Sequence, residues 1–200
     1  MNIILGSASP RRRELMKGID IPFTCVSIDA DEHFPATLKA GDIPLYIARQ
    51  KAKAYKSQLT KDDMLITADT IVWLNAQMLG KPHSEDEAKQ MLRLLSGKTH
   101  QVYTGVCFTW FNLQSQSWDE YTLVDKTDVT FRELDEDEIQ TYVERYRPLD
   151  KAGSYGVQEW IGYVGVTSMQ GSYFNVMGFP IEKVYMFLRS HLSVCRQVNG

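Results

Sequence analysis

The first fifteen residues limit the fold more than any other stretch of this chain. Residues 2–5 are a short apolar run typical of a buried strand, and residues 6–9 are Gly, Ser, Ala and Ser. Ser9 stands at an expected helix N-cap, and Pro10 at the first helical position, where its missing N–H has no intrahelical partner to lose. The sequence therefore predicts a strand, a tight loop and a helix in direct succession.

The predicted helix begins with three arginines, Arg11, Arg12 and Arg13. A helix N-terminus carries partial positive charge, so each exposed cation in its first turn costs about 0.3–1 kcal/mol. Small loop residues, free N–H groups at a helix start and guanidinium donors together suit a bound phosphate. A solvated basic turn is the alternative, and it is the commoner explanation for an isolated basic triplet. The small residues before the triplet and the acidic and lysine positions described below favour the phosphate site.

Composition is typical of a single globular domain. With 200 residues, 44% hydrophobic and 24% charged, we expect one domain over residues 1–200, formed by two lobes with no linker. The net charge of -3 argues against a general nucleic-acid binder, which needs a basic face that neutralises many phosphates. Any anion site is therefore local, and no stable nucleic-acid partner is expected.

The cysteines and the hydropathy pattern bear on the cellular compartment. Cys25, Cys107 and Cys195 are odd in number, widely spaced and without a CxxC pair, so neither a disulfide framework nor a zinc site is predicted. No basic region precedes a long apolar stretch, and no segment has the roughly 18 apolar residues of a membrane helix. We expect a soluble, cytoplasmic protein with no membrane partner.

A helix is predicted over residues 42–55, and it carries one misplaced lysine. Helical periodicity places the apolar residues on one arc and Arg49, Lys53 and Lys56 on the opposite arc. Lys51 falls inside the apolar arc. Its side chain either runs along the surface to reach water or points into a cleft at something anionic.

Two carboxylates stand out. Asp69 lies in the middle of residues 64–74, the most apolar stretch and the expected central strand, where an aspartate needs a cation, a metal or a catalytic role. A structural aspartate at a bulge or turn is the alternative. Glu32 belongs to an acidic cluster after the predicted strand 22–29, and such a cluster is either a metal or base site or a solvated loop.

The rest of the chain alternates strands and helices. Lys81 lies in a turn before a helix that a capping box at 84–87 opens and Gly97 closes. The apolar stripe of this helix is Ala88, Met91, Leu92 and Leu95. Further along come a hairpin of strands near 101–111 and 118–131, a capped helix at 135–146, a polar loop at 149–158, an alternating stretch at 163–176 and a final helix at 180–192. The loop is either a turn or a ligand contact. This order predicts an α/β fold with a mixed twisted sheet flanked by helices.

Together these residues favour phosphoanhydride chemistry. Cations alone would bind a polyphosphate, and carboxylates beside them add a means to hold a divalent ion and to orient water. The chain contains no GxxxxGK[ST] motif, so a P-loop nucleotidase is not supported. It also lacks GxSxG and HExxH, which disfavours an esterase or a metalloprotease.

Six short motifs, taken in order, resemble the Maf family of nucleoside triphosphate pyrophosphatases over residues 3 to about 190. They are Ser7–Arg12, Ala48–Ala52, Ala68–Thr70, Gly80–Pro82, Leu95–His100 and Asp150–Gln158. The resemblance implies an elongated α/β fold similar to that of the inosine triphosphate pyrophosphatases, with a cleft between two lobes. It also implies cleavage of a nucleoside triphosphate to the monophosphate and pyrophosphate with Mg²⁺ or Mn²⁺. The Ala-Asp-Thr motif and the final glutamine resemble the subgroup that acts on dTTP and UTP, and a homodimer is compatible with the resemblance.

The resemblance also implies roles for ten residues. The catalytic set is Asp69 as proton acceptor with Lys81, Lys51 and Glu32, and Glu32 and Asp69 would lie at the metal. The substrate-binding set is Ser7, Arg11, Arg12, Thr70, Gln158 and Lys151. A glutamine side chain has a donor and an acceptor, which suits the polar edge of thymine or uracil, and a small threonine leaves room beside it. Whether Asp69 takes the proton or holds the metal is not decided by the sequence.

Two departures from the family pattern concern the same site. Arg13 adds a third arginine where the motif has two, and Glu159 and Trp160 replace a glycine-rich continuation. The alternative function is a nucleotide-sensing or cell-division regulatory protein that uses the basic loop without turnover. A simple sensor has no need of a carboxylate that activates water, so the combination of Asp69, Lys81 and Gln158 favours the enzyme.

Overall fold

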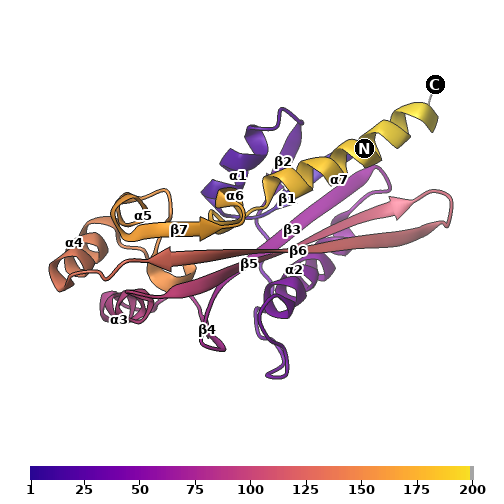
Figure 1. The fold of residues 1–200 in the computed structure, drawn as a ribbon. Coiled ribbons are helices and arrows are strands. Elements are labelled where there is room, and N and C mark those ends of the chain that lie inside the picture. Colours follow the sequence, from indigo (N-terminus) through magenta and orange to yellow (C-terminus); the bar gives the residue numbers. More distant parts are fainter. Residues whose placement is uncertain (199–200) are drawn as a thin grey trace.

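A seven-stranded mixed sheet forms the centre of the computed structural model, which describes residues 1–198 and the side chains of residues 1–192 (Figure 1). β1 (Asn2–Gly6) pairs in parallel with β2 (Phe23–Val26) and with β3 (Asp63–Leu74). Antiparallel pairs then join β3 to β5 (Thr99–Asn112), β5 to β6 (Ser117–Phe131) and β6 to β7 (Val166–Gln170), while β4 (Gln77–Leu79) pairs with β3. The predicted mixed sheet, with residues 64–74 at its centre, is confirmed.

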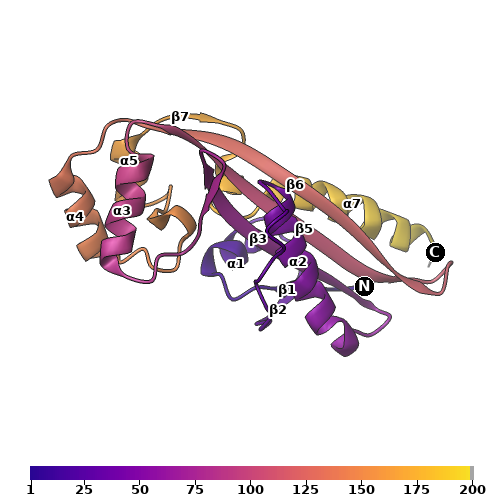
Figure 2. The ribbon, with the colours of Figure 1, turned by 90° about the horizontal axis from the view of Figure 1, so that it is seen from below.

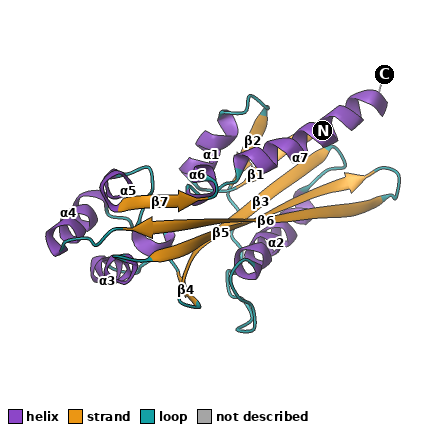
Figure 3. Ribbon diagram, viewed as in Figure 1, coloured by secondary structure: helices purple, strands orange, loops and turns teal. Residues whose placement is uncertain are grey.

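The β5–β6 hairpin runs almost the full length of an elongated molecule (Figures 1 and 2). Helices lie against both faces of the sheet at one end and gather beside it at the other, which gives two lobes (Figure 3). The shorter elements are η1 (Lys56–Gln58), η2 (Ala152–Ser154), α5 (Trp160–Gly165) and α6 (Tyr173–Val176).

Alternation along β3 builds the first lobe. Leu65 points to α2 (Asp42–Tyr55), where it packs with Ala48 and Ala52. Its neighbour Ile66 points to the other face, where the core is covered by α1 (Pro10–Lys17) and α7 (Ile181–Val198). Because side chains of a strand alternate between faces, this strand needs apolar cover on both sides, which explains its continuous hydrophobic run.

The second lobe packs α3 (Glu85–Leu95) and α4 (Glu136–Tyr146) beside the far ends of β3, β5 and β6. The predicted stripe of α3 is fully buried in this core: Ala88, Met91, Leu92 and Leu95. Gly97 has a φ of 68° directly after the helix, as the predicted C-terminal cap requires. Both helices therefore begin and end where the sequence predicts.

Several local predictions are wrong in detail. Ser9 occupies the predicted N-cap position of α1, but its hydroxyl makes no cap hydrogen bond; its backbone N–H donates to Ser7 Oγ at 3.2 Å. Ser84 caps α3, but the Glu87 carboxylate accepts from the His83 N–H rather than closing the capping box. The alternating stretch 163–176 is divided among α5, β7 and α6, because Gly171, with a φ of 133°, ends the strand against β6.

Two element lengths also differ from the sequence expectation. The strand predicted over 22–29 shortens to β2, and the final helix extends from Ile181 to Val198 instead of ending near residue 192. Cys25 and Cys107 are free thiols, whereas the side chain of Cys195 lies outside the described residues. Over residues 1–198, no helix combines the length and the apolar character needed to cross a membrane.

Candidate functional site

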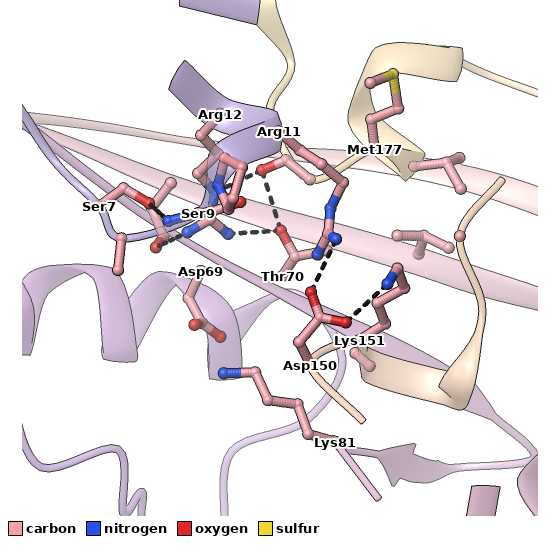
Figure 4. Close-up of a pocket in the computed structure, with 18 of the residues that line it drawn as sticks. Ser7, Ser9, Arg11, Arg12, Asp69, Thr70, Lys81, Asp150, Lys151 and Met177 are labelled. Atoms are coloured by element: carbon pink, nitrogen blue, oxygen red, sulfur yellow. Dashed lines mark hydrogen bonds and ion pairs between the residues drawn. The ribbon is translucent and has the colours of Figure 1, made fainter. Parts of the chain in front are cut away.

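A cavity of about 330 Å³ lies between the two lobes (Figure 4). Its walls come from the β1–α1 loop, the middle of β3, α2, the loop after β4 and the segments 150–158 and 176–178. All ten residues predicted for the site line it: Ser7, Arg11, Arg12, Glu32, Lys51, Asp69, Thr70, Lys81, Lys151 and Gln158. Segments up to about 170 residues apart in the sequence therefore meet at one place.

Arg12 ties three segments together at the start of α1. Its Nη1 donates to the Ala68 carbonyl at 2.8 Å, its Nε to the Gly178 carbonyl at 2.8 Å and its Nη2 to Thr70 Oγ1 at 3.0 Å. Burial lowers the pKa of Arg12, and the charge of Asp69 opposes that shift. Three of the five N–H donors of the guanidinium are thus used inside the protein, so Arg12 is a structural clamp as well as the predicted phosphate ligand.

Close packing of α2 on the sheet places Lys51. A Cβ on Gly105 would lie 2.4 Å from the backbone nitrogen of Leu45, so only glycine permits this approach. Thr67 then fastens the helix by donating its hydroxyl to the Ala48 carbonyl at 2.7 Å. Lys51, one turn further along, points into the cleft rather than toward bulk water.

Lys51 joins the two predicted carboxylates. Its Nζ lies 2.8 Å from Asp69 Oδ1 and 2.8 Å from Glu32 Oε1. Burial opposes ionisation of Glu32, but the hydrogen bond and charge of Lys51, with the charges of Lys81 and Arg12, outweigh it and lower the pKa of Glu32. Lys81 directs its ammonium group toward the carboxylate of Asp69 (Figure 4). The carboxylates are therefore surrounded by cations.

The carboxylate pair fits one divalent ion only with help from a substrate. Among the described side chains, no group of three or more His, Cys, Asp or Glu residues could hold a metal. Glu32 and Asp69 nevertheless reach the same nitrogen atom, so their oxygens are close neighbours. Mg²⁺ is often bound by one or two carboxylates together with phosphate oxygens and water, and this donor set suits that arrangement.

An ion-pair chain forms the wall opposite Asp69. Arg11 Nη1 lies 3.1 Å from Asp150 Oδ2, and Lys151 Nζ lies 2.7 Å from Asp150 Oδ1 and 3.0 Å from Glu159 Oε1. Burial opposes ionisation of Asp150, but Lys151 and Arg11 outweigh it and lower its pKa. Within residues 1–192, the Gln158 side-chain amide has no hydrogen-bond partner, so its donor and acceptor are available to a ligand.

Sequence reasoning missed two contributors to the site. Asp150 lines the cavity and pairs with Arg11; it opens the motif Asp150–Gln158, but no role in the site was predicted for it. Gly178 has a φ of 107°, and its carbonyl accepts from Arg12 and from the Thr70 hydroxyl. A glycine in a loop gives no sequence signal for this role, because the contact joins residues more than 100 positions apart.

His100 lies behind the cavity wall and makes stability depend on pH. The side chain is fully buried, its Nε2 is 2.7 Å from the Tyr155 hydroxyl, and its Nδ1 has no partner among the described atoms. Burial lowers the pKa of His100 to about 4, and the charge of Asp128 opposes the shift. The unfolded chain, with an ordinary histidine pKa, therefore binds a proton between about pH 6.5 and pH 4 that the folded protein excludes.

We expect the free energy of unfolding to fall by about 3 kcal/mol as pH drops through that window, because protonation favours the unfolded chain. His100→Gln, which keeps a polar partner for Tyr155, should remove this share of the pH dependence. Urea unfolding of the wild type and the variant at several pH values gives, for each protein, the slope of the free energy of unfolding against pH. Equal slopes would contradict the assignment to His100.

Known proteins resemble this chain over nearly its whole length. The model of the family described as Maf-like protein matches residues 2–191. The chain is 53% identical over 188 residues to the dTTP/UTP pyrophosphatase of Phocaeicola vulgatus, with 94% of each chain covered. It is 49% identical over 190 residues to the dTTP/UTP pyrophosphatase of Porphyromonas gingivalis strain W83, with 94% of this chain and 92% of the relative covered.

The fold is also similar to a solved structure with little sequence identity. The Ham1 protein of Staphylococcus aureus superimposes with a TM-score of 0.54 at 15% identity, covering 96% of this chain and all of the other. This likeness shows a shared two-lobed α/β architecture, as the sequence motifs led us to expect. The family match, which spans nearly the whole chain, and relatives at about half identity show that this chain belongs to the Maf family.

Proposed function

We propose that this protein hydrolyses dTTP and UTP to the nucleoside monophosphate and pyrophosphate, acting on free nucleotides in the cytoplasm. The observation that carries the proposal is the placement of Asp69, on the central strand, inside a cavity lined by cationic side chains. The relatives at 53% and 49% identity bear the name dTTP/UTP pyrophosphatase. A nucleotide sensor that does not hydrolyse its ligand has no need of a carboxylate that contacts Lys51 and faces the ammonium group of Lys81.

The charge of the cavity suits a metal–triphosphate complex. Five cationic side chains line it (Arg11, Arg12, Lys51, Lys81 and Lys151) against three carboxylates (Glu32, Asp69 and Asp150), which leaves two net positive charges. A nucleoside triphosphate with one divalent cation carries about two negative charges, so the two are complementary. The acidic protein as a whole therefore still offers a favourable local site for a polyanion.

In the proposed reaction, water attacks the α-phosphorus and the bond to the oxygen that bridges to the β-phosphate breaks. Asp69 accepts the proton of the attacking water, and pyrophosphate leaves with its charge balanced by Lys81 and Arg11. Lys51 orients the Asp69 carboxylate, as its 2.8 Å contact supports. Glu32 and Asp69 would hold Mg²⁺ or Mn²⁺, which supplies neutralisation of phosphate charge and a lower pKa for bound water.

The base would lie beside Gln158 and Thr70. The Gln158 amide offers one donor group and one acceptor to the polar edge of uracil or thymine. Thr70 Oγ1 already accepts from Arg12 and lies 2.9 Å from Thr104 Oγ1, so its small side chain is fixed and shapes the pocket. We further propose that both lobes act as one domain, because β3, β5 and β6 run through both.

A product assay tests the function. With Mg²⁺ or Mn²⁺, purified protein should release pyrophosphate and not orthophosphate from dTTP and UTP, and should turn over purine triphosphates more slowly. Removal of the metal with a chelator should abolish product, and addition of excess Mg²⁺ should restore it. Nucleotide binding with no product over the whole panel would support the sensing alternative instead.

A further inference from the structure

Glu159 stands where the family motif has a glycine-rich continuation, and its side chain makes two contacts inside the protein. It stands at the N-cap position of α5, and only 19% of the side chain is exposed. Oε2 accepts a hydrogen bond from the Tyr142 hydroxyl, and Oε1 lies 3.0 Å from Lys151 Nζ. Neither Glu159 nor Tyr142 is among the described residues that line the cavity, so both act behind its wall.

Tyr142 holds the same loop at a second point. This fully buried side chain of α4 accepts a hydrogen bond from the Gly156 N–H at 3.0 Å while it donates to Glu159. Burial raises the pKa of Tyr142, as do the hydrogen bond and charge of Glu159, so the phenol keeps the proton it donates. A Cβ on Gly156 would lie 2.7 Å from the carboxylate carbon of Glu159, so glycine makes room for this contact.

Gln158 lies inside the turn that these contacts close. The Glu159 N–H donates to the Gly156 carbonyl at 3.0 Å, which closes residues 156–159 into one turn. One end of the turn is therefore bonded to Tyr142 and the other carries the carboxylate that Tyr142 and Lys151 hold. The backbone of Gln158 has little freedom, although its amide remains without a partner in the described structure.

The contacts continue to the phosphate side of the cavity. Lys151 donates a hydrogen bond to Asp150 and forms an ion pair with Glu159, and Asp150 in turn pairs with Arg11 at the start of α1. The carboxylate of Glu159 thus connects the loop that carries Gln158, through Lys151 and Asp150, to Arg11 in the opposite lobe. Figure 4 shows the Asp150 side chain between those of Arg11 and Lys151.

We propose that Glu159, held by Tyr142, is a positioning residue for pyrimidine recognition, which fixes the Gln158 turn and Lys151 without touching the substrate. The inference rests on the proposed function, because it assigns Gln158 to the base. On this proposal Glu159, which departs from the glycine-rich family pattern, has a role in shaping the base pocket. Chemistry at Asp69 is not expected to depend on it directly.

Steady-state kinetics of Glu159→Gln and Tyr142→Phe test the proposal. Both changes nearly preserve side-chain volume, and each removes one part of the contact. We expect KM for UTP and dTTP to rise about tenfold while kcat stays within about twofold, because ground-state positioning of the base is lost. The preference for UTP over CTP in kcat/KM should fall. The double variant should cost less than the product of the two single effects, since both break one network.

Glu144→Gln and Tyr146→Phe are the matched controls. Both lie on α4, Glu144 is exposed and pairs with Lys89, and Tyr146 stacks on Tyr142. These variants should keep wild-type KM and selectivity. A fall in unfolding temperature with unchanged KM and unchanged selectivity would overturn the proposal, because it would show a purely structural role.

Calorimetry measures the binding of UMP and of inorganic tripolyphosphate, both without metal. These affinities test base positioning by Glu159 separately from the proposed pyrophosphatase activity. Weaker UMP binding with unchanged tripolyphosphate binding in both Glu159→Gln and Tyr142→Phe supports base positioning, even if wild-type protein releases no pyrophosphate. Equal UMP affinities for wild type and variants contradict the positioning role even if wild-type protein is an active pyrophosphatase.

Discussion

Asp69→Asn should lower kcat for pyrophosphate release from dTTP and UTP by about 10³-fold, within the range expected when a general base is removed. The carboxylate lies 2.8 Å from Lys51 Nζ and faces the cavity, and an amide of the same shape cannot accept the proton of water. Nucleotide binding should persist, because the surrounding cations remain. Pyrophosphate release and calorimetric UTP binding measure the two effects separately.

Asp62→Asn is the control for charge. Asp62 is exposed in the turn before β3, so the variant has the same net charge as Asp69→Asn with no change in the cavity. It should retain wild-type kcat and KM. Normal turnover by Asp69→Asn, with a matching unfolding curve, would show that another group activates the water and would overturn the catalytic assignment.

Arg12→Lys should lower the free energy of unfolding by about 3 kcal/mol, because one ammonium group cannot serve three separate acceptors. The carbonyls of Ala68 and Gly178 and the hydroxyl of Thr70 each receive one guanidinium hydrogen bond in the structure. The start of α1 would shift against β3, and kcat/KM should fall about 10²-fold, as small displacements of catalytic groups commonly cause. Urea unfolding and pyrophosphate release measure both losses.

Arg13→Lys provides the comparison within the same triplet. Arg13 is exposed, and among the described residues its guanidinium donates only to the Ala8 carbonyl, at 3.0 Å, so the same substitution should leave stability and activity nearly unchanged. If Arg12→Lys is as stable and as active as the wild type, Arg12 contributes only its charge, and the clamp inferred from the geometry is wrong.

Local sequence signals predicted most of the first lobe and both capped helices of the second. The apolar run of β3, the stripe of α3 and the stop at Gly97 each depend on neighbouring residues, whose pattern is visible in the chain. Prediction failed over residues 163–176, where α5, β7 and α6 follow one another within a few residues. There, packing against β6 and the positive φ of Gly171 decide the conformation, and neither is a local pattern.

The sequence by itself determined which chemistry was available: arginines at a helix start, Lys51 on an apolar arc and Asp69 in a hydrophobic strand each conflict with their local setting. The tertiary structure alone decided how that chemistry is shared. Most of the Arg12 donors bind acceptors within the protein, and Lys51 lies between Glu32 and Asp69. Arg11 is connected to Glu159 through Asp150 and Lys151. The physical reason is that a misplaced charge can be read from its neighbours in the chain, whereas its partner comes from a distant segment that only folding brings within hydrogen-bond distance.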